Sequence, residues 1–226
     1  MGKNKLERFA ETETFKNFVQ LPAYNFTEDF YLKNKWSSDF FGNDHPLFLE
    51  LGCGKGEYTV GLSRLYPENN YVGIDIKGAR MWRGAKTAID ENISNAGFLR
   101  IHINQINHFF GEKEVSGIWI TFPDPQPQKA RANKRLTSPR FLERYRPLLK
   151  KDAIINLKTD NVGLFEYTLE VIEQQKHSLL AHTFDLYASE MDNEAKKIQT
   201  FYESRFLEEG KKICYLQFRL NQLEEK

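Results

Sequence analysis

The sequence predicts an α/β protein with a Rossmann-like, doubly wound, mostly parallel seven-stranded sheet, of which the last strand is antiparallel. Two observations lead to this prediction. Short apolar segments typical of buried strands alternate with helical patterns along most of the 226 residues, as parallel sheets with right-handed crossovers require. The final two strand-like segments, about 179–187 and 212–220, are more polar and are separated by a long connection, which suits a hairpin-like pair at a sheet edge.

Hydrophobic periodicity and the positions of glycine and proline place the individual elements. An aromatic-rich segment over residues 15–41 is expected to pack as a lead-in around Pro22 and a short helix. The first sheet strand is expected to begin at Leu47 and to end before Gly52. Further strands are predicted over about 70–76, 98–103, 117–122 and 153–159, and helices over about 57–66, 78–94, 105–110, 139–149 and 162–175.

One domain is expected over residues 15–226, because the chain shows no internal repeat, low-complexity segment or linker, and its length suits a single core. Residues 1–14 are polar and bury little, which predicts a flexible basic N-terminal tail. Hydrophobic residues make up 40% of the chain and charged residues 28%, as in globular proteins. The net charge of +1 neither requires nor excludes nucleic acid as a partner.

The two cysteines, Cys53 and Cys214, are isolated in the sequence, and no His or Cys cluster has the spacing of metal ligands. A reducing compartment and no metal site are therefore expected. No signal peptide and no run of 18 apolar residues is evident, so we expect a cytoplasmic protein that does not enter a membrane. The composition leaves open whether the protein is a monomer or a homodimer.

The segment LFLELGCGKG (Leu47–Gly56) joins the first sheet strand to a helix. Its three glycines stand at alternate positions: Gly52, Gly54 and Gly56. Glycine lets the backbone adopt positive φ and approach a ligand closely, and the following helix offers unpaired N–H groups. The next strand, YVGID, ends in Asp75 about 20 residues later, the usual distance for a carboxylate that binds a ribose hydroxyl. This pairing predicts a nucleotide-like ligand across the first two strands.

The residues of this turn narrow the choice of ligand. The phosphate-binding pattern GxxxxGK[ST] is absent, since Gly56 rather than Ser or Thr follows Lys55. Glu50 lies two residues before the first glycine, where it would repel a pyrophosphate but suit an ammonium or sulfonium. S-adenosyl-L-methionine is therefore favoured as the cofactor. Two alternatives remain: a tight turn without a ligand, and a nicotinamide-dependent oxidoreductase, which Asp75 would suit equally well.

A second motif, IWITFPDPQPQKARANKRL (residues 118–136), follows the fourth predicted strand. Pro123 and Pro125 flank Asp124, and proline restricts the backbone on both sides of itself. The carboxylate is therefore expected to be held rigidly at the end of a strand, where open α/β sheets bind ligands. Four cations follow within seven residues: Lys129, Arg131, Lys134 and Arg135. They form either a solvated loop or a contact to a phosphate backbone, which their place beside the crevice favours.

From about Phe15 onward, the chain resembles the bacterial tRNA (guanine-N7-)-methyltransferases. The matching pieces, in order, are ELGCGKG, GIDI, the FPDP loop with its basic residues, LKTD at Leu157–Asp160 and TFYE at Thr200–Glu203. Together, their order and spacing are specific. The resemblance implies the class I methyltransferase fold, S-adenosyl-L-methionine as cofactor, and methylation of guanine N7 at position 46 in the variable loop of tRNA.

The resemblance also implies roles for single residues. Glu50 would lie at the methionine end of the cofactor and Asp75 at its ribose, and Asp124 would be catalytic as well as touching the cofactor. The implied cofactor residues are Glu50, Gly52, Gly54, Asp75, Asn104 and Asp124. The implied tRNA-binding residues are Gln128, Lys129, Arg131, Lys134, Arg135, Asp160, Thr200, Phe201, Tyr202 and Glu203.

The basic loop departs from the family pattern. That loop commonly reads DPWPK with an Arg-His pair after it, whereas this chain has Gln126 and Gln128 in place of Trp and Lys. Lys129 and Arg131 are close enough in sequence to substitute for the missing cations. The sequence therefore leaves the exact tRNA contacts open.

Two of the matching pieces also allow purely structural roles. Asp160 could cap the helix that follows it, directly or through Asn161, and Thr200 with Glu203 forms a capping-box pattern.

Two other functional classes also remain as alternatives. One is a non-catalytic RNA-binding protein that retains the cofactor fold, and the other is a methyltransferase that acts on a protein or a small molecule.

Overall fold

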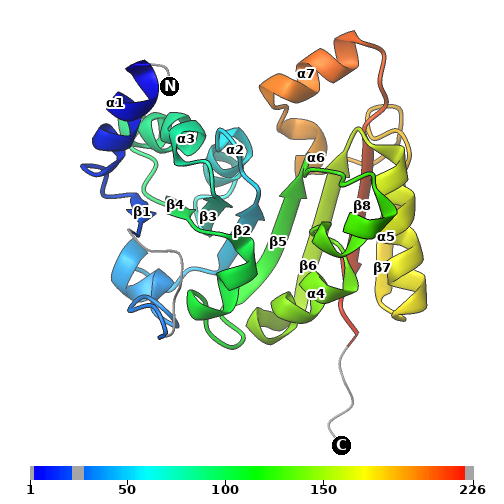
Figure 1. Cartoon of the computed structure of the whole chain (residues 1–226), viewed down its shortest axis with the longest axis horizontal. Coiled ribbons are helices and arrows are strands. Elements are labelled where there is room, and N and C mark those ends of the chain that lie inside the picture. The colour runs from blue at the N-terminus through cyan, green and yellow to red at the C-terminus, as the bar shows by residue number, and fades with distance from the viewer. Residues whose placement is uncertain (1–2, 22–27, 222–226) are drawn as a thin grey trace, which may run out of the picture.

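An eight-stranded sheet forms the centre of the molecule (Figure 1). The structure, a computed structural model, describes residues 3–21 and 28–221. In sheet order the strands are β1 (Phe18–Gln20), β4 (Ala96–Arg100), β3 (Asn70–Asp75), β2 (Leu47–Leu51), β5 (Val115–Thr121), β6 (Leu149–Thr159), β8 (Cys214–Arg219) and β7 (Ser178–Thr183). Neighbouring strands are parallel from β1 to β6, and β8 runs antiparallel to both of its neighbours.

The predicted fold class is confirmed, with one correction to the sheet. The lead-in contributes an eighth strand, β1, which pairs in parallel with β4 so that Phe18 lies opposite Phe98. The antiparallel last strand is confirmed, and so is the antiparallel pair of the last two strands at a sheet edge: β7 is the edge strand, and β8 lies between it and β6. The part of the lead-in expected around Pro22 lies outside the described residues.

The predicted helices occur close to their expected positions, with small shifts at the ends. The connection between β7 and β8 carries two more helices, and four short helical turns lie elsewhere. The helices are α2 (Glu57–Leu65), α3 (Gly78–Asp90), α4 (Pro139–Tyr145), α5 (Val162–Gln174), α6 (Glu194–Lys197) and α7 (Phe201–Glu208). The turns are η1 (Trp36–Phe41), η2 (Ile103–His108), η3 (Lys129–Lys134) and η4 (Arg146–Leu148).

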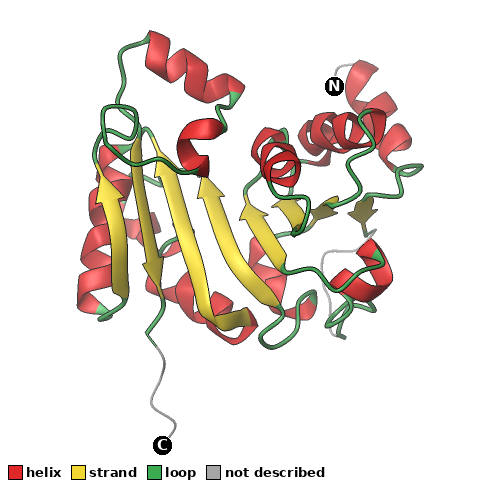
Figure 2. Ribbon diagram, turned by 180° about the vertical axis from the view of Figure 1, so that it is seen from behind, coloured by secondary structure: helices red, strands yellow, loops and turns green. Residues whose placement is uncertain are grey.

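Side chains that alternate along the central strands face two separate helical layers. On β2, Leu49 and Leu51 belong to the main core with residues of α4 and α5, whereas Phe48 packs on the opposite face with the cluster around Tyr58 of α2. Burial of each such leucine contributes about 1.5–3 kcal/mol. Figures 1 and 2 show the resulting layers, with α2 and α3 on one face of the sheet and α4 and α5 on the other.

The N-terminal segment is ordered as a helix where composition predicts a flexible tail. Helix α1 (Lys3–Thr12) packs on α3, and the indole N–H of Trp82 donates to Glu11 at 2.7 Å. The guanidinium of Arg8 lies 4.8 Å from the centre of the Trp82 ring. A polar segment of this kind buries little by itself, so its order depends on a surface of α3 that only the tertiary structure provides.

Candidate active site

A cavity of about 480 Å³ opens at the carboxyl ends of β2, β3 and β5. Its walls come from the glycine turn after β2, the start of α3, the loop after β5 and the N-terminus of α7. The predicted site residues that line it are Glu50, Gly52, Gly54, Asp75, Asp124, Lys134, Thr200 and Tyr202. The structure therefore brings both sequence motifs to a single site, at the place where open α/β sheets bind ligands.

The glycines of the turn serve different purposes. Gly52, Gly54 and Gly56 all have positive φ, at 79°, 55° and 72°, which side chains rarely tolerate. A Cβ on Gly54 would have no heavy atom within 4 Å and would project into open space at the cavity wall. A Cβ on Gly56 would lie 2.4 Å from the Phe98 ring. Gly54 thus leaves room for a ligand, whereas Gly56 lets α2 approach the sheet.

Glu50 is a buried carboxylate in the cavity lining, with only 3% of its surface exposed. Thr121 donates its hydroxyl to one carboxylate oxygen at 2.6 Å. The Thr59 N–H donates to the other oxygen at 2.8 Å, and the Thr59 hydroxyl donates to that oxygen too. Burial raises the pKa of the Glu50 carboxyl to about 7, although these hydrogen bonds oppose the shift. A cationic ligand group beside Glu50 would favour its ionised form.

Asp75 lies at the end of β3, on the wall beside the glycine turn. Its two carboxylate oxygens accept hydrogen bonds from the backbone N–H groups of Gly54, at 3.0 Å, and Lys77, at 2.8 Å. These bonds fix the carboxylate plane and link it to the glycine turn. Since an ionised carboxylate can accept about four hydrogen bonds, acceptor positions remain for hydroxyl groups of a ligand.

Asp124 stands exposed on the loop after β5, between two residues with unusual backbone conformations. Phe122 and Gln126 have φ of 46° and 44°, in the left-handed region that non-glycine residues rarely adopt. The Gln126 N–H donates to the Asp124 carboxylate at 3.0 Å, and the Phe122 N–H donates to the Lys158 carbonyl at 2.8 Å. Strained residues of this kind persist where the surrounding structure holds them, and they cluster at functional sites.

Arg135 supplies part of this support. Its guanidinium donates to the Pro125 carbonyl at 3.1 Å and to the Gln126 carbonyl at 3.2 Å, and it lies 4.2 Å from the centre of the Tyr167 ring. The sequence identified Arg135 as a tRNA-binding cation, but its donors serve the Asp124 loop. Sequence spacing alone could not distinguish this role from a phosphate contact.

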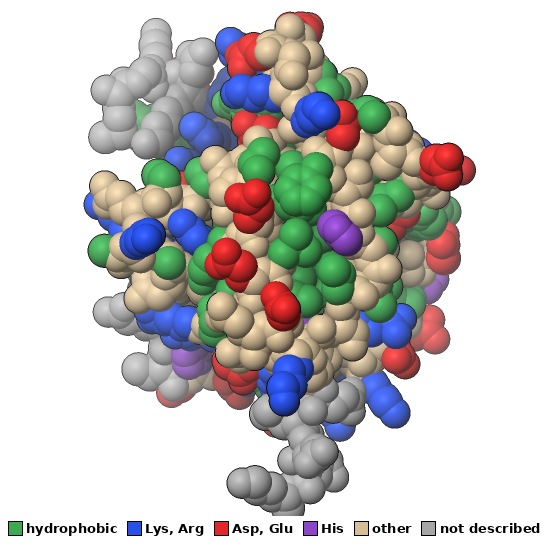
Figure 3. Space-filling view, turned by 90° about the vertical axis from the view of Figure 1, so that its right-hand side faces the viewer, with side chains coloured by type: hydrophobic (Ala, Val, Ile, Leu, Met, Phe, Trp, Pro, Cys, Tyr) green, Lys and Arg blue, Asp and Glu red, His purple; other side chains and the backbone are tan. Residues whose placement is uncertain are grey.

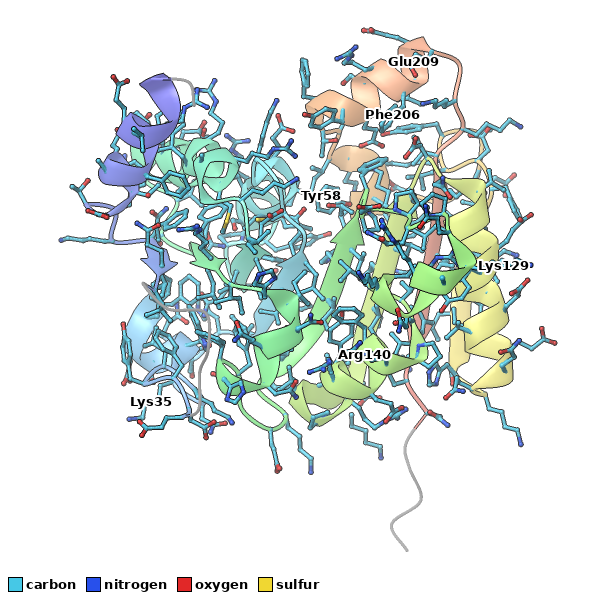
Figure 4. The ribbon with its side chains drawn as sticks, in the orientation of Figure 1. Lys35, Tyr58, Lys129, Arg140, Phe206 and Glu209 are labelled. Atoms are coloured by element: carbon cyan, nitrogen blue, oxygen red, sulfur yellow. The ribbon has the colours of Figure 1, made fainter. Side chains whose placement is uncertain are left out.

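The other residues of the basic loop lie on and around η3. Lys134 lines the cavity, whereas Gln128, Lys129 and Arg131 are exposed outside its lining. Figure 4 shows Lys129 on the same side of the molecule as α5, away from the centrally placed Tyr58. The cations of the loop thus extend from the cavity wall to the protein surface on one side of the cavity opening.

Helix α7 carries the TFYE motif, and the structure divides its residues into two roles. Thr200 caps the helix and forms the capping box with Glu203, so this structural expectation is confirmed. Glu203 is completely buried, so its carboxylate is not accessible to a substrate. Phe201 and Tyr202 are 52% and 43% exposed, and the Lys55 ammonium lies 4.2 Å from the centre of the Phe201 ring. The two aromatic side chains therefore form an exposed rim next to the cavity.

Asn104 and Asp160 are two further predicted residues outside this cavity lining. Asn104 is exposed on η2 and its backbone carbonyl accepts a hydrogen bond from Arg144 at 2.7 Å. Asp160 is partly exposed and its carboxylate lies 3.7 Å from the Lys211 ammonium. Asn161 caps α5, with its side chain accepting from the Leu164 N–H, so Asp160 itself does not provide the cap.

Three residues that organise the site were not predicted from the sequence. Thr59 and Thr121 hold Glu50, and the buried Lys158 lies beneath α7. The pattern LKTD contains Lys158, but a lysine in a strand end is usually exposed, so its burial could not be read from the sequence. Thr121 lies at the end of a predicted strand, and only the register of β2 with β5 places it near Glu50.

Within residues 3–21 and 28–221, no group of three or more His, Cys, Asp or Glu side chains could hold a metal ion. The same described part of the chain contains no helix long and apolar enough to cross a membrane.

The fold is that of the class I methyltransferases. Among solved structures, a 30S ribosomal A1408 methyltransferase from an uncultured bacterium matches with a TM-score of 0.59 at 14% identity, over 88% of this chain and 98% of that chain. This likeness concerns the fold alone.

The sequence relatives identify the family. A family model described as "Putative methyltransferase" matches residues 44–216. The tRNA (guanine-N(7)-)-methyltransferase of Christiangramia forsetii is 51% identical over 97% of this chain and 99% of its own length. That of Bacteroides thetaiotaomicron is 48% identical over 98% of this chain and 88% of its own length. The chain belongs to the tRNA (guanine-N(7)-)-methyltransferase family, as the sequence motifs predict.

Proposed function

We propose that this protein transfers the methyl group of S-adenosyl-L-methionine to N7 of guanine 46 in the variable loop of tRNA. One observation carries the proposal: three carboxylates, Glu50, Asp75 and Asp124, line a single cavity next to an exposed aromatic rim. Family membership supports the tRNA substrate and the target atom. Position 46 follows from the resemblance of the motifs.

The residues of the cavity fit the proposed cofactor. Glu50 offers a buried anion for the ammonium or sulfonium end, Asp75 offers acceptors for ribose hydroxyls, and Gly52 and Gly54 keep the wall free of side chains. When bound, S-adenosyl-L-methionine supplies an electrophilic methyl group on a sulfonium. A nicotinamide dinucleotide fits less well, because its pyrophosphate would pass the buried carboxylate of Glu50.

Asp124 is proposed to hold the target base. Guanine N7 carries a free lone pair at neutral pH, so no residue needs to remove a proton from the nucleophile. The reaction requires in-line placement of two partners, and orientation can lower such barriers by up to about 7–11 kcal/mol. A rigidly held carboxylate can accept hydrogen bonds from the guanine N1–H and amino group and offset the positive charge that the purine gains. Asp124, fixed by its bond from Gln126, meets both requirements.

The rim residues are proposed to bind the rest of the RNA. A guanine stacked inside tRNA must be unstacked to reach the cavity, and aromatic side chains commonly replace the lost stacking. Phe201 and Tyr202 are exposed next to the cavity for this purpose. Lys129, Arg131 and Lys134 are proposed to contact phosphates on the η3 side.

Methyl transfer to two tRNA transcripts tests the proposal. The transcripts are identical except for guanine or adenine at position 46, and the methyl group of S-adenosyl-L-methionine is labelled. We expect label only in the guanine transcript, released by strand cleavage directed at 7-methylguanine. Equal label in both transcripts would refute position 46. Label in neither, with cofactor binding intact, would refute tRNA as the substrate.

A further inference from the structure

A second hollow, of about 460 Å³, lies between α2, α3 and the segment that joins α6 to α7. Its lining includes Val60, Gly61 and Leu65 of α2, Gly84 and Thr87 of α3, and Ile198 and Gln199 before α7. Lys55 and Glu57 line both this hollow and the cavity of the candidate active site. The two hollows therefore adjoin, with Lys55 and its aromatic neighbour Phe201 at their junction.

Basic side chains dominate the polar lining of this α2–α3 groove: Lys55, Arg64, Arg83 and Lys197. Glu57 is the single carboxylate among its lining residues, and it already accepts the Phe201 N–H at 3.2 Å. Arg64 pairs with Glu91 at 2.6 Å. Arg83 is exposed and forms no ion pair with any of the described residues. Lys197 lies 3.8 Å from the Asp192 carboxylate, and both of these side chains are exposed. The four cations thus outnumber the single carboxylate in the lining, and Arg83 is free to bind an external anion.

The unpaired charge continues along α3 toward the active site. Lys77, Arg80 and Arg83 follow at three-residue spacing, all three are exposed, and the first two line the active-site cavity. Residues three apart lie on one side of a helix. The row extends for about 9 Å along the axis at 1.5 Å per residue, which matches two to three nucleotides of a stacked strand at about 3.4 Å each.

We propose that the α2–α3 groove and this row bind the phosphate backbone of the RNA strand that flanks the target base. The inference rests on the proposed function and adds a second contact surface, opposite the η3 loop across the mouth of the cavity. The strand would run from the groove past Lys55 and the aromatic rim to the target base, and phosphates on the other side would meet η3. Contacts on both sides of the target base would offset the stacking energy that the base loses when it leaves the folded tRNA.

The opposite side of the molecule argues for this orientation. Figure 3 shows the side formed by β7 and α5, where hydrophobic side chains gather and acidic side chains lie among them. Its exposed apolar residues include Leu179, Leu180 and Phe184. Carboxylates repel phosphates and apolar side chains do not bind them, so the RNA is not expected to continue beyond η3 over this face.

The test removes two charges that line the groove but not the active-site cavity, in the full chain: Arg83→Gln with Lys197→Gln. The matched control is Arg140→Gln with Lys151→Gln, which removes two exposed cations elsewhere. Arg140 lies at the end of the molecule opposite α7 (Figure 4), and Lys151 lies near the amino end of β6. The affinity for a tRNA transcript is measured between 50 and 300 mM salt, with thermal unfolding to verify the fold.

Each phosphate contact adds about 0.7–0.9 to the slope of log affinity against log salt, so the groove variant should lose about 1.5 units of slope. At 150 mM salt, this corresponds to roughly 20-fold weaker tRNA binding. Cofactor affinity should not change, and the control should keep both the wild-type slope and affinity. Equal slopes and affinities for the two variants would overturn the inference.

The same assay distinguishes this inference from the proposed function. If the wild type methylates the guanine 46 transcript and the groove variant binds it with unchanged slope, only the groove inference fails. If the wild type neither binds nor methylates the transcript, the proposed function fails and the groove inference falls with it.

Discussion

The ammonium of Lys158 lies 2.6 Å from a carboxylate oxygen of Glu203, and both side chains are completely buried. Lys158 also donates to the carbonyls of Ala195, at 2.5 Å, and Ile198, at 2.9 Å, so its three N–H groups are all used. Glu203 accepts the Tyr187 hydroxyl at 2.7 Å and the Thr200 N–H at 3.2 Å. The pair therefore ties β6 to the segment that carries the aromatic rim of the active site.

Lys158→Met should destabilise the protein strongly, because it leaves the Glu203 carboxylate buried without its partner. Breaking a buried pair on one side costs about 3–5 kcal/mol, and at roughly 2–4 °C per kcal/mol the unfolding midpoint should fall by about 6–20 °C. Thermal unfolding at pH 7 measures this effect. The double variant Lys158→Met with Glu203→Met should recover much of the loss; a double variant as unstable as the sum of both single variants would contradict the account.

Tyr202→Ala should weaken tRNA use without affecting cofactor binding. Aromatic stacking contributes about 1–3 kcal/mol per base, which predicts a KM for tRNA roughly 5- to 150-fold higher. Steady-state kinetics at saturating cofactor give this value. Tyr31→Ala is the matched control, since Tyr31 is 71% exposed in the segment before β2. An equal effect of both substitutions would argue against stacking at the rim.

Cofactor affinity should decrease as the pH falls below about 7. Burial raises the pKa of Glu50 to about 7 in the free protein, and a cationic ligand group binds the ionised carboxylate. At a pH above this pKa the carboxylate is ionised and can pair with the cation. At a pH below it, each further pH unit should weaken cofactor binding by up to about tenfold. Calorimetric titration between pH 5.5 and 7.5 measures the effect. Glu50→Gln should bind weakly with a flat profile; a flat profile in the wild type would exclude this linkage.

Asp124→Asn should reduce kcat by about 100-fold, in the range found when one stabilising group is removed from a transition state. The amide can still accept the Gln126 N–H, so the loop should keep its conformation, and cofactor binding should change little. Single-turnover methyl transfer gives the rate. The control is Asp152→Asn, an exposed carboxylate near the amino end of β6. Full turnover in Asp124→Asn with unchanged tRNA affinity would remove the catalytic role.

Arg135 and Lys134 should behave differently although they are adjacent. Arg135→Lys loses the paired hydrogen bonds to Pro125 and Gln126, so the Asp124 loop should loosen and kcat should fall. Lys134→Gln removes one cation at the cavity wall, so the KM for tRNA should rise while kcat stays near the wild-type value. The same kinetic series tests both residues. If Arg135→Lys raised only KM, the guanidinium would be a tRNA contact rather than a support for the loop.

Much of the site was predictable because its signals are local. The glycines after β2 and the prolines around Asp124 act on the backbone within a few residues, and strand ends of a parallel sheet meet at one edge. These rules place Glu50, Asp75 and Asp124 together before any contact is known. They also predict the order of the elements and the antiparallel last strand.

Only the tertiary structure decided which side chains pair across the fold. Thr121 donates to Glu50 from 71 residues away. Glu203 of α7 is paired with the buried Lys158 of β6, and the partly buried Arg135 supports the Asp124 loop. Helix α1 is ordered by a surface on α3. Local backbone preferences are encoded by near neighbours in the chain, whereas burial and the choice of ionic partners depend on packing between distant segments, which no short pattern specifies.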